Sequence, residues 1–402
     1  MKTVAIISEY NPFHNGHLYQ IEQLRKLYGD DTAIIAIMSS NFTQRGDIAI
    51  MDKWARAEAA VLCGVNLVLE LPFPYSMSSA EFFAKAGVHI AHSIGVVDVI
   101  AFGSESGDIA ALKKAADNLS SPVIEEEIAR LAATKDNLGY AEIRELAYKN
   151  VYGYEPPIST ANNILAVEYI RALRAENSTI TPFTLKRNGA DYNDEIIADG
   201  SIQSATAIRN LFFKNETSAS DFIPNNVLKC ILNERSAGGF PCDCEALFSA
   251  VAASFTLNFT NDKSDIHDVG GGLYNRLKNK SLEATSINSL VELTSTKKYT
   301  TARIRRGIWY SLLGVTSSDV RVLPEYTQVL GMDKVGQALL KRIKKSSSLS
   351  ILTRPSDTPC SPVAVKQKEL SDKADALSQL AKPTVSTTGS IYKRSPFVKK
   401  DV

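Results

Sequence analysis

Two histidines spaced three residues apart are the strongest chemical signal in the chain. They end the segment Ile7-Ser8-Glu9-Tyr10-Asn11-Pro12-Phe13-His14-Asn15-Gly16-His17. Because a helix brings residues i and i+3 to one face, both imidazoles can meet the same group. Gly16 lets a ligand approach the backbone closely. Such a pair could stabilise negative charge that develops on a phosphoryl group and on its leaving group.

The position of this motif indicates a phosphate site. Thr3–Ser8 is a short apolar run that predicts a buried strand, and the residues from His17 to Tyr28 have a helical pattern. The motif therefore lies where a strand ends and a helix begins, so that free backbone N–H groups and the positive helix end point at a ligand. The Gly-x-x-x-x-Gly-Lys motif of a P-loop is absent. The simpler alternative is a pair of surface histidines beside a turn.

The first two hundred residues alternate between apolar runs and helical patterns. The runs are continuous, which is typical of parallel strands covered by helices on both faces. The predicted strands are Thr3–Ser8, Thr32–Met38, Asn66–Leu71, Val96–Phe102 and Thr179–Lys186. The predicted helices are His17–Tyr28, Asp52–Cys63, Ser78–Ser93 and Ser204–Phe213. This order predicts a doubly wound α/β domain that binds its ligand beyond the carboxyl ends of the strands.

The pattern becomes mainly helical from about Lys214 onward. We therefore expect an N-terminal catalytic domain over residues 1–213 and a mainly helical domain over residues 214–345. Residues 346–402 are rich in Ser, Thr, Pro and Lys, which predicts a partly irregular C-terminal extension. Within this extension, Glu369–Leu380 could form one short helix.

The composition is that of a soluble globular protein, with 44% hydrophobic residues, 22% charged residues and a net charge of +1. No apolar run approaches the roughly 18 residues of a membrane span, and the N-terminus lacks the features of a secretory signal. We therefore expect a cytoplasmic protein without membrane contact. The five scattered cysteines have poor spacing for zinc, so we expect reduced structural thiols and no metal site.

Further segments give the chain a family resemblance. Its His14–His17 motif resembles the HIGH-type signature of nucleotidylyltransferases and class I aminoacyl-tRNA synthetases. More narrowly, the chain resembles the tRNA(Met) cytidine acetate ligase family. The segments that carry this resemblance are Glu9–His17, Asn41–Gly46, Glu70–Pro74, Phe102–Glu105, Asn162–Tyr169, Lys186–Arg187, Ser204–Arg209 and, more loosely, Thr300–Arg306. The resemblance implies a Rossmann-like doubly wound parallel sheet of the nucleotidylyltransferase type, followed by a mainly helical domain.

The resemblance also implies an ATP site. Its catalytic residues would be His14, His17 and Arg209. Its ATP-binding residues would be Ile7, Ser8, Glu9, Tyr10, Asn11, Pro12, Phe13, His14, Asn15, Gly16, His17, Leu18, Tyr19, Gln20, Gly103, Asn162, Asn163, Arg187, Asn188, Ser204 and Thr206. We expect Mg²⁺ to enter with ATP, without dedicated protein ligands. Simpler interpretations are a strand-ending glycine at 103, helix caps at 162, 163 and 204, and a solvated Arg187.

Two further segments are candidates for substrate contact. Asn41–Gly46 follows the second predicted strand, where it could hold the substrate or close the site, or simply form a surface turn. The basic residues that could bind RNA are Lys297, Lys298, Arg303, Arg305 and Arg306. Local positive charge of this kind would contact tRNA phosphates, although charge runs are also typical of solvated helix faces.

The family resemblance implies a two-step ligation. Acetate and ATP would give acetyl-adenylate, and the wobble cytidine in the anticodon loop of elongator tRNA(Met) would take the acetyl group on its exocyclic amine, giving N(4)-acetylcytidine. The expected partners are therefore acetate and tRNA, with no protein partner. The residues alone indicate only nucleotidyl transfer. They leave open a small-molecule adenylyltransferase for cofactor dinucleotides and a non-catalytic nucleotide-dependent RNA-binding protein.

Overall fold

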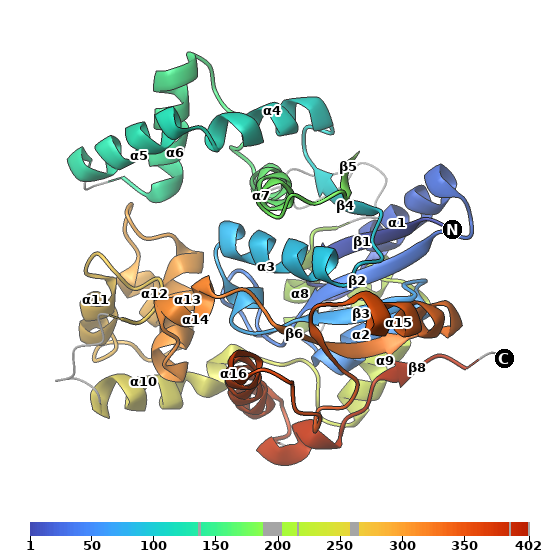
Figure 1. The fold of residues 1–402 in the computed structure, drawn as a ribbon. Coiled ribbons are helices and arrows are strands. Elements are labelled where there is room, and N and C mark those ends of the chain that lie inside the picture. Colours follow the sequence, from blue (N-terminus) through green and yellow to red (C-terminus); the bar gives the residue numbers. More distant parts are fainter. Residues whose placement is uncertain (136–137, 188–202, 215–216, 258–264, 386, 401–402) are drawn as a thin grey trace.

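A largely parallel β-sheet forms the centre of the molecule (Figure 1). The computed structural model describes residues 1–135, 138–187, 203–214, 217–257, 265–385 and 387–400. The strands are β1 (Thr3–Ser8), β2 (Ala33–Ser39), β3 (Leu67–Leu71), β4 (Val99–Ser104), β5 (Thr181–Lys186), β6 (Tyr326–Met332), β7 (Ser350–Leu352) and β8 (Phe397–Val398). Their order across the sheet is β5-β4-β1-β2-β3-β6-β7, and β8 pairs with β6. This order places the end of β1, where the histidine motif begins, near the middle of the sheet.

The strands β1 to β5 are parallel to one another, and β6 runs antiparallel to β3. Successive side chains of β1 enter opposite cores, with Val4 and Ile6 on one face and Ala5 on the other. Both faces of the sheet are covered by helices, which is why the strands are continuous apolar runs. Because the strands are parallel, their carboxyl ends meet at one edge, where the loops can share a ligand.

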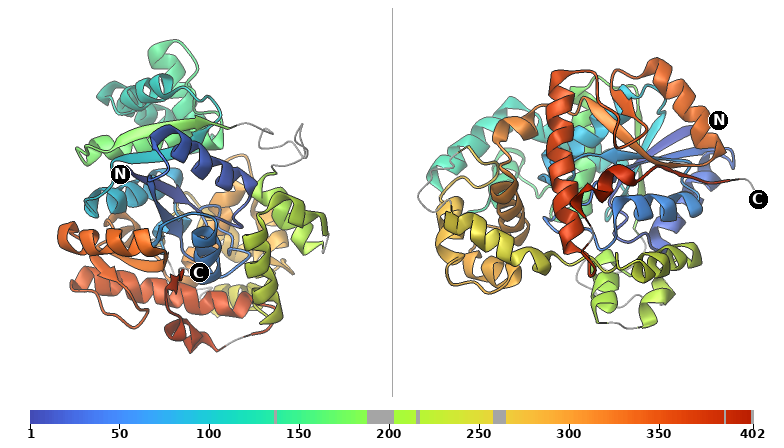
Figure 2. Two further views of the ribbon diagram at one scale, coloured as in Figure 1. Left: turned by 90° about the vertical axis from the view of Figure 1, so that its right-hand side faces the viewer. Right: turned by 90° about the horizontal axis from the view of Figure 1, so that it is seen from below.

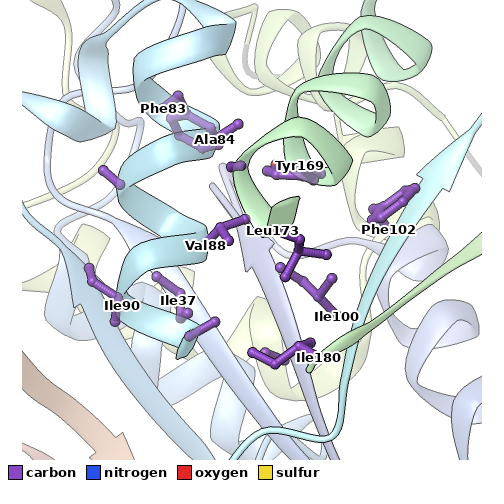
Figure 3. Close-up of a cluster of buried hydrophobic side chains, with 14 of the residues drawn as sticks. Ile37, Phe83, Ala84, Val88, Ile90, Ile100, Phe102, Tyr169, Leu173 and Ile180 are labelled. Carbon is purple, nitrogen blue, oxygen red and sulfur yellow. The ribbon is translucent and has the colours of Figure 1, made fainter. Parts of the chain in front are cut away.

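The helices form two layers around the sheet. On the face of Ala5 lie α3 (Ala80–Ser93), α4 (Ile109–Leu119), α7 (Ala161–Ala175) and α15 (Lys334–Ser346). Figure 3 shows Val88 of α3 facing α7, whose Tyr169 lies beside Phe102 of β4. On the face of Val4 lie α1 (Asn15–Tyr28), α2 (Lys53–Leu62), α8 (Ala205–Phe213) and α9 (Asn225–Ser236). Helices α5 (Pro122–Thr134) and α6 (Tyr140–Tyr152) project away from the sheet beyond α4 (Figure 1).

A third group of helices gathers at one side of the sheet. It consists of α10 (Phe248–Leu257), α11 (Leu273–Lys280), α12 (Ile287–Thr294), α13 (Thr301–Leu313) and α14 (Ser317–Arg321). Helix α16 (Pro362–Ser378) lies between this group and the sheet (Figure 2). The core of this region joins Trp309 of α13 and Ala374 of α16 to Phe42 and Phe73, which come from loops after β2 and β3. The helical group is therefore packed against the same edge that carries the histidine motif.

The structure confirms the α/β class and places β1 to β5 within three residues of the predicted strands. It also shows elements that the sequence interpretation did not contain. Strand β6 lies inside the range 214–345, where a mainly helical domain was expected, and it extends the central sheet beside β3. The segment 346–402, expected to be partly irregular, contains β7 and the 17-residue helix α16. The predicted short helix Glu369–Leu380 is thus longer at its start, because Pro362 at the first turn begins it.

Across the described segments, no helix is both long and apolar enough to cross a membrane. The five cysteines are free thiols, with Cys63, Cys230 and Cys242 buried and Cys360 exposed. Burial raises the pKa of the Cys63 and Cys230 thiols to about 12, so both stay protonated at neutral pH. Buried, protonated thiols suit a structural role at these two positions, whereas Cys360 is exposed.

Candidate active site

A cavity of about 340 Å³ opens at the carboxyl ends of β1, β4 and β5. Its volume lies in the range of small-molecule sites. The lining side chains that matter below are those of Ser8, Glu9, Asn11, His14, His17, Gln44, Arg45, Gly103, Glu105, Asn162, Arg187, Ser204, Thr206 and Arg209. Apolar side chains complete the wall, among them Phe83, Phe102, Leu165 and Tyr169. The cavity therefore combines cationic, amide and apolar surface, as a nucleotide requires.

The two imidazoles are stacked at the start of α1. Their ring centroids are 3.7 Å apart at an interplanar angle of 25°. Nδ1 of His14 accepts the backbone N–H of Gly16 at 3.1 Å, and Nδ1 of His17 accepts the backbone N–H of His14 at 3.2 Å. His14 is the N-cap residue of α1, so the histidines use one nitrogen each to cap the helix. This capping explains why the pair stands at the helix start with a spacing of three.

These hydrogen bonds fix the tautomer of both rings. A neutral imidazole whose Nδ1 accepts a hydrogen bond carries its proton on Nε2. Burial, with the charges of Arg187 and Arg209, lowers the pKa of His14 to about 3. Burial, with His14 and Arg187, also lowers the pKa of His17 well below its ordinary value. At neutral pH both rings are therefore uncharged, and each has an Nε2–H group that can donate to a phosphate oxygen.

Arginines supply the positive charge that the neutral histidines do not. Nη1 of Arg209 donates to the backbone oxygen of Asn11 at 2.9 Å, and its Nη2 donates to Oγ1 of Thr206 at 3.1 Å. Helix α8 thereby holds Arg209 against the histidine loop. Ser204 caps α8 by accepting the N–H of Ala207 at 3.1 Å, so the predicted cap and the cavity wall are the same residue. Arg187 also lines the cavity, at the end of β5.

A turn after β4 forms the opposite wall. Oδ1 of Asn163 accepts the backbone N–H groups of Glu105 and Ser106 at 3.0 and 3.3 Å. The carboxylate of Glu105 accepts Nδ2 of Asn162 at 2.7 Å and the N–H of Asn163 at 2.9 Å. Asn163 thus holds the turn through its side-chain oxygen. Asn162 and Gly103 line the cavity. A side chain at Gly103 would press on Arg187, since its Cβ would lie 3.2 Å from Cγ of that residue.

The structure brings most of the predicted ATP-binding residues together. Among them, the cavity is lined by Ile7, Ser8, Glu9, Tyr10, Asn11, His14, His17, Gln20, Gly103, Asn162, Arg187, Ser204 and Thr206. Others lie outside the lining: Pro12, Phe13, Asn15, Gly16, Leu18, Tyr19 and Asn163. Phe13 is fully buried in the core beneath the loop, whereas Tyr19 is 37% exposed on the outer side of α1. Asn188 lies outside the described residues.

Sequence reasoning gave no role to Arg56, which joins two of the loops that border the cavity. The side chain of Arg56, on α2, is completely buried and donates to three backbone oxygens, those of Glu9 at 2.6 Å, Ser40 at 2.6 Å and Met51 at 2.9 Å. It thereby ties the loop after β1 to the loop after β2. The one available signal was a lone arginine within the alanine-rich helix KWARAEAAVL. That pattern is equally typical of an exposed charge, so it could not identify the role.

The predicted RNA-binding arginines make protein contacts instead of forming a solvated charge run. Nη2 of Arg306 pairs with Oδ2 of Asp268 at 2.6 Å, and Nη1 of Arg305 pairs with Oδ1 of Asp47 at 2.9 Å. Nε of Arg303 donates to the backbone oxygen of Asp268 at 2.9 Å. Lys297 is exposed and Lys298 is half-buried. The five residues therefore divide into two lysines on a turn and three arginines packed into the fold.

The described residues include no cluster of His, Cys, Asp or Glu side chains that could hold a metal ion by itself. Glu9 and Glu105 line the cavity, but both already accept hydrogen bonds from the protein. Mg²⁺ bound mainly through ATP phosphates would fit such a wall, because this ion usually keeps several water ligands.

A parallel sheet, a histidine pair that caps the first helix and two arginines around one cavity define a nucleotide-binding α/β protein of the nucleotidyl-transfer class. The sequence matches the model of the HIGH nucleotidyl transferase family over residues 1–391. A tRNA(Met) cytidine acetate ligase of Acetivibrio thermocellus is 38% identical over 390 residues, which cover 92% of each chain. Another, from Clostridium perfringens, is 34% identical and covers 99% of this chain and 100% of that one.

Solved structures agree with this relationship. The crystal structure of apo Thermotoga maritima TmcAL has a TM-score of 0.92 at 30% identity, over 99% of both chains. The form of that protein bound with alpha-thio ATP has a TM-score of 0.89 at 29% identity, again over 99% of both chains. The chain therefore belongs to the HIGH nucleotidyl transferase family and, within it, to the family of tRNA(Met) cytidine acetate ligases.

Proposed function

We propose that this protein is an ATP-dependent ligase that acetylates the wobble cytidine of elongator tRNA(Met). The observation that carries the proposal is the pair of neutral imidazoles that share one cavity with Arg187 and Arg209. The relationship to the tRNA(Met) cytidine acetate ligases supplies the substrates. We further propose that the enzyme works in the cytoplasm and takes Mg²⁺ together with ATP.

In the first step, a carboxylate oxygen of acetate attacks the α-phosphorus of ATP. The bond to the β-phosphate breaks, and pyrophosphate leaves with its electron pair. The Nε2–H groups of His14 and His17 donate to the phosphoryl oxygens, while Arg209 and Arg187 offset the charge of the leaving pyrophosphate. Since both rings are neutral before ATP binds, they act as hydrogen-bond donors and not as acids. The products of this step are acetyl-adenylate and pyrophosphate.

In the second step, the exocyclic amine of the cytidine attacks the acetyl carbonyl. AMP leaves, the amine loses a proton, and N(4)-acetylcytidine remains. The adenylate is needed because the lone pair of a cytosine amine is delocalised into the ring, which makes the amine a poor nucleophile. An anticodon base can reach such a site because single-stranded loop bases can be turned outward into a pocket.

We propose that the helical group α10 to α14, within the range 214–345, forms the tRNA side of the enzyme. The lysines of the turn before α13, Lys297 and Lys298, would contact tRNA phosphates, together with the exposed part of Arg303. This turn lies close to the start of α6, since a side chain on Gly139 would reach the backbone oxygens of both lysines at 3.9 Å. The projecting helices α5 and α6 would then lie beside the bound RNA.

The test uses labelled acetate, ATP and two transcripts of elongator tRNA(Met), one with cytidine at the wobble position and one with uridine. The proposal predicts ATP-dependent label on the cytidine transcript alone, and acetate-dependent ATP–pyrophosphate exchange without any tRNA. Pyrophosphate release with no labelled RNA would instead favour a small-molecule adenylyltransferase. RNA that is retained while ATP stays intact would favour a non-catalytic RNA-binding protein.

A further inference from the structure

We propose that helix α13 is a positioning element for adenylate formation, acting through the loop Asn41–Asp47. In this inference, which rests on the proposed function, Trp309, Arg305 and Arg306 hold the loop so that Gln44 and Arg45 stand in the cavity wall. None of these three residues lines the cavity. They are positioning residues, and two of them are arginines that the sequence had suggested as RNA contacts.

The closest approach is between Gly46 and α13. Gly46 has a φ of +80°, and a Cβ atom on it would lie 2.6 Å from Cβ of Arg305 and 2.7 Å from the backbone N of Arg306. The loop backbone therefore lies directly on the helix, and only glycine fits there. Nε1–H of Trp309 donates to the backbone oxygen of Gly46 at 2.6 Å, in a fully buried position. One loop residue is thus fixed by both shape and a hydrogen bond.

One ion pair and one hydrogen bond hold the residues on the two sides of Gly46. Arg305 pairs with Asp47 on one side, at 2.9 Å. On the other side, Nη1 of Arg306 reaches the backbone oxygen of Gln44 at 3.4 Å. Nε and Nη2 of Arg306 both donate to Oδ2 of Asp268, at 2.9 and 2.6 Å, so its guanidinium has little freedom to move. An arginine anchored in this way transmits the position of α13 to the loop.

The loop in turn contacts the histidine loop. The backbone N–H of Gln44 donates to Oε1 of Glu9 at 2.9 Å, and Gln44, Arg45 and Glu9 line the same cavity. A continuous chain of contacts thus runs from Asp268 through Arg306 and Gln44 to Glu9. Chemistry at the α-phosphorus needs its groups placed to about 0.5 Å, and an error of about 1 Å can cost on the order of 100-fold in rate. Loss of a contact in this chain should therefore slow adenylate formation even when no tRNA is present.

The test compares Trp309→Phe with Tyr310→Phe. The first change removes the hydrogen bond to Gly46. The control removes the buried hydroxyl of Tyr310, the next residue of the same helix, which donates to the backbone oxygen of Met77 at 2.8 Å and lies 3.2 Å from Oγ of Ser78. The measurements are acetate-dependent ATP–pyrophosphate exchange without tRNA, the unfolding temperature, and the ATP bound per chain in equilibrium dialysis.

We expect Trp309→Phe to lose more unfolding temperature than Tyr310→Phe, because it also leaves a cavity in the core, and both variants to bind one ATP per chain. Exchange should fall about 10-fold in Trp309→Phe and stay within about twofold of wild type in Tyr310→Phe, since about 1 Å of misplacement is worth up to 100-fold. Equal exchange in the two variants, or a fall that matches a loss of ATP-binding chains, would overturn the inference. If the wild type itself shows no exchange, the proposed function fails instead.

Arg306→Lys separates this inference from direct RNA contact. Lysine keeps the positive charge but cannot bind both Asp268 and the oxygen of Gln44. Positioning predicts reduced exchange in the absence of tRNA. If exchange is intact without tRNA and only the transfer of acetate to tRNA is weakened, Arg306 is an RNA contact and the inference is wrong.

Discussion

The two loops that meet over the cavity are held in different ways. In the histidine loop after β1, the two imidazoles are fixed by short-range bonds among His14, Gly16 and His17 at the start of α1, and Arg56 and Arg209 bind only the backbone that precedes them. The loop after β2 depends on residues far along the chain, because Asn41 contacts Asp375 of α16 and Gly46 contacts Trp309 of α13. The two imidazoles can thus be recognised within a short segment, whereas the contacts that align the rest of the site are distributed over the chain.

A cluster of buried charged side chains connects the loop after β2 to helix α16. Nζ of Lys53 lies 2.6 Å from Oε1 of Glu70 and 2.5 Å from Oδ2 of Asp375, and all three side chains are almost fully buried. Nδ2 of Asn41 donates to the other oxygen of Asp375 at 3.0 Å. Burial raises the pKa of Asp375 to about 7 although Lys53 lowers it. Helix α16 is therefore joined to the start of the loop through this cluster.

Replacement of Lys53 by methionine should have the largest effect on stability. It would leave two buried carboxyl groups without their cation, a change that typically costs about 3–5 kcal/mol in the free energy of unfolding. The measurement is urea denaturation of Lys53→Met beside Lys85→Met, which breaks a more exposed pair with Glu81. The control should stay within about 1 kcal/mol of wild type. If both variants lose the same small amount of unfolding free energy, the buried cluster does not support the loop.

Replacement of Arg56 by lysine should disturb both loops at once. A single ammonium group cannot reach the three backbone oxygens of Glu9, Ser40 and Met51 that Arg56 binds. We expect a loss of about 1–3 kcal/mol in stability, from buried acceptors left unpaired, together with slower pyrophosphate exchange. Arg25→Lys is the control, since Arg25 also donates to a backbone oxygen, that of Gly64, away from the cavity. If ATP–pyrophosphate exchange is unchanged in Arg56→Lys, the link that Arg56 makes between the two loops is not needed for adenylate formation.

Of these changes, a change of pH should alter the histidine loop least, because the rings of His14 and His17 stay neutral in the ligand-free protein. We expect ring ¹⁵N shifts of both residues to report the Nε2–H tautomer from pH 8 down to pH 5.5, since the pKa of His14 is about 3. In the unfolded chain these rings take up protons near pH 6.5, so acid should favour unfolding below that pH. A titration midpoint near 6.5 in the folded protein would contradict the neutral-donor mechanism. Assignment would come from His14→Asn and His17→Asn.

The contrast between the loops also explains what the sequence could predict. The parallel strands and the ATP loop follow from local patterns of apolar residues and from the position of one motif. Strand β6 could not be predicted, because nothing in Tyr326–Met332 indicates that it pairs antiparallel with β3. Helix α16 looked like part of a polar extension because it buries Lys368 and Asp375, residues that are usually exposed. Its burial depends on partners such as Lys53, more than three hundred residues earlier.

The direct test of the central claim is acetate-dependent ATP–pyrophosphate exchange by His17→Ala. Removing one donor to a developing negative charge typically costs about 100- to 1000-fold in rate. We expect a loss of that size in a protein that is still folded, with His92→Ala, a histidine on α3 outside the cavity lining, close to wild type. Exchange by His17→Ala at the wild-type rate would contradict the assignment of the imidazole pair to the ATP phosphates.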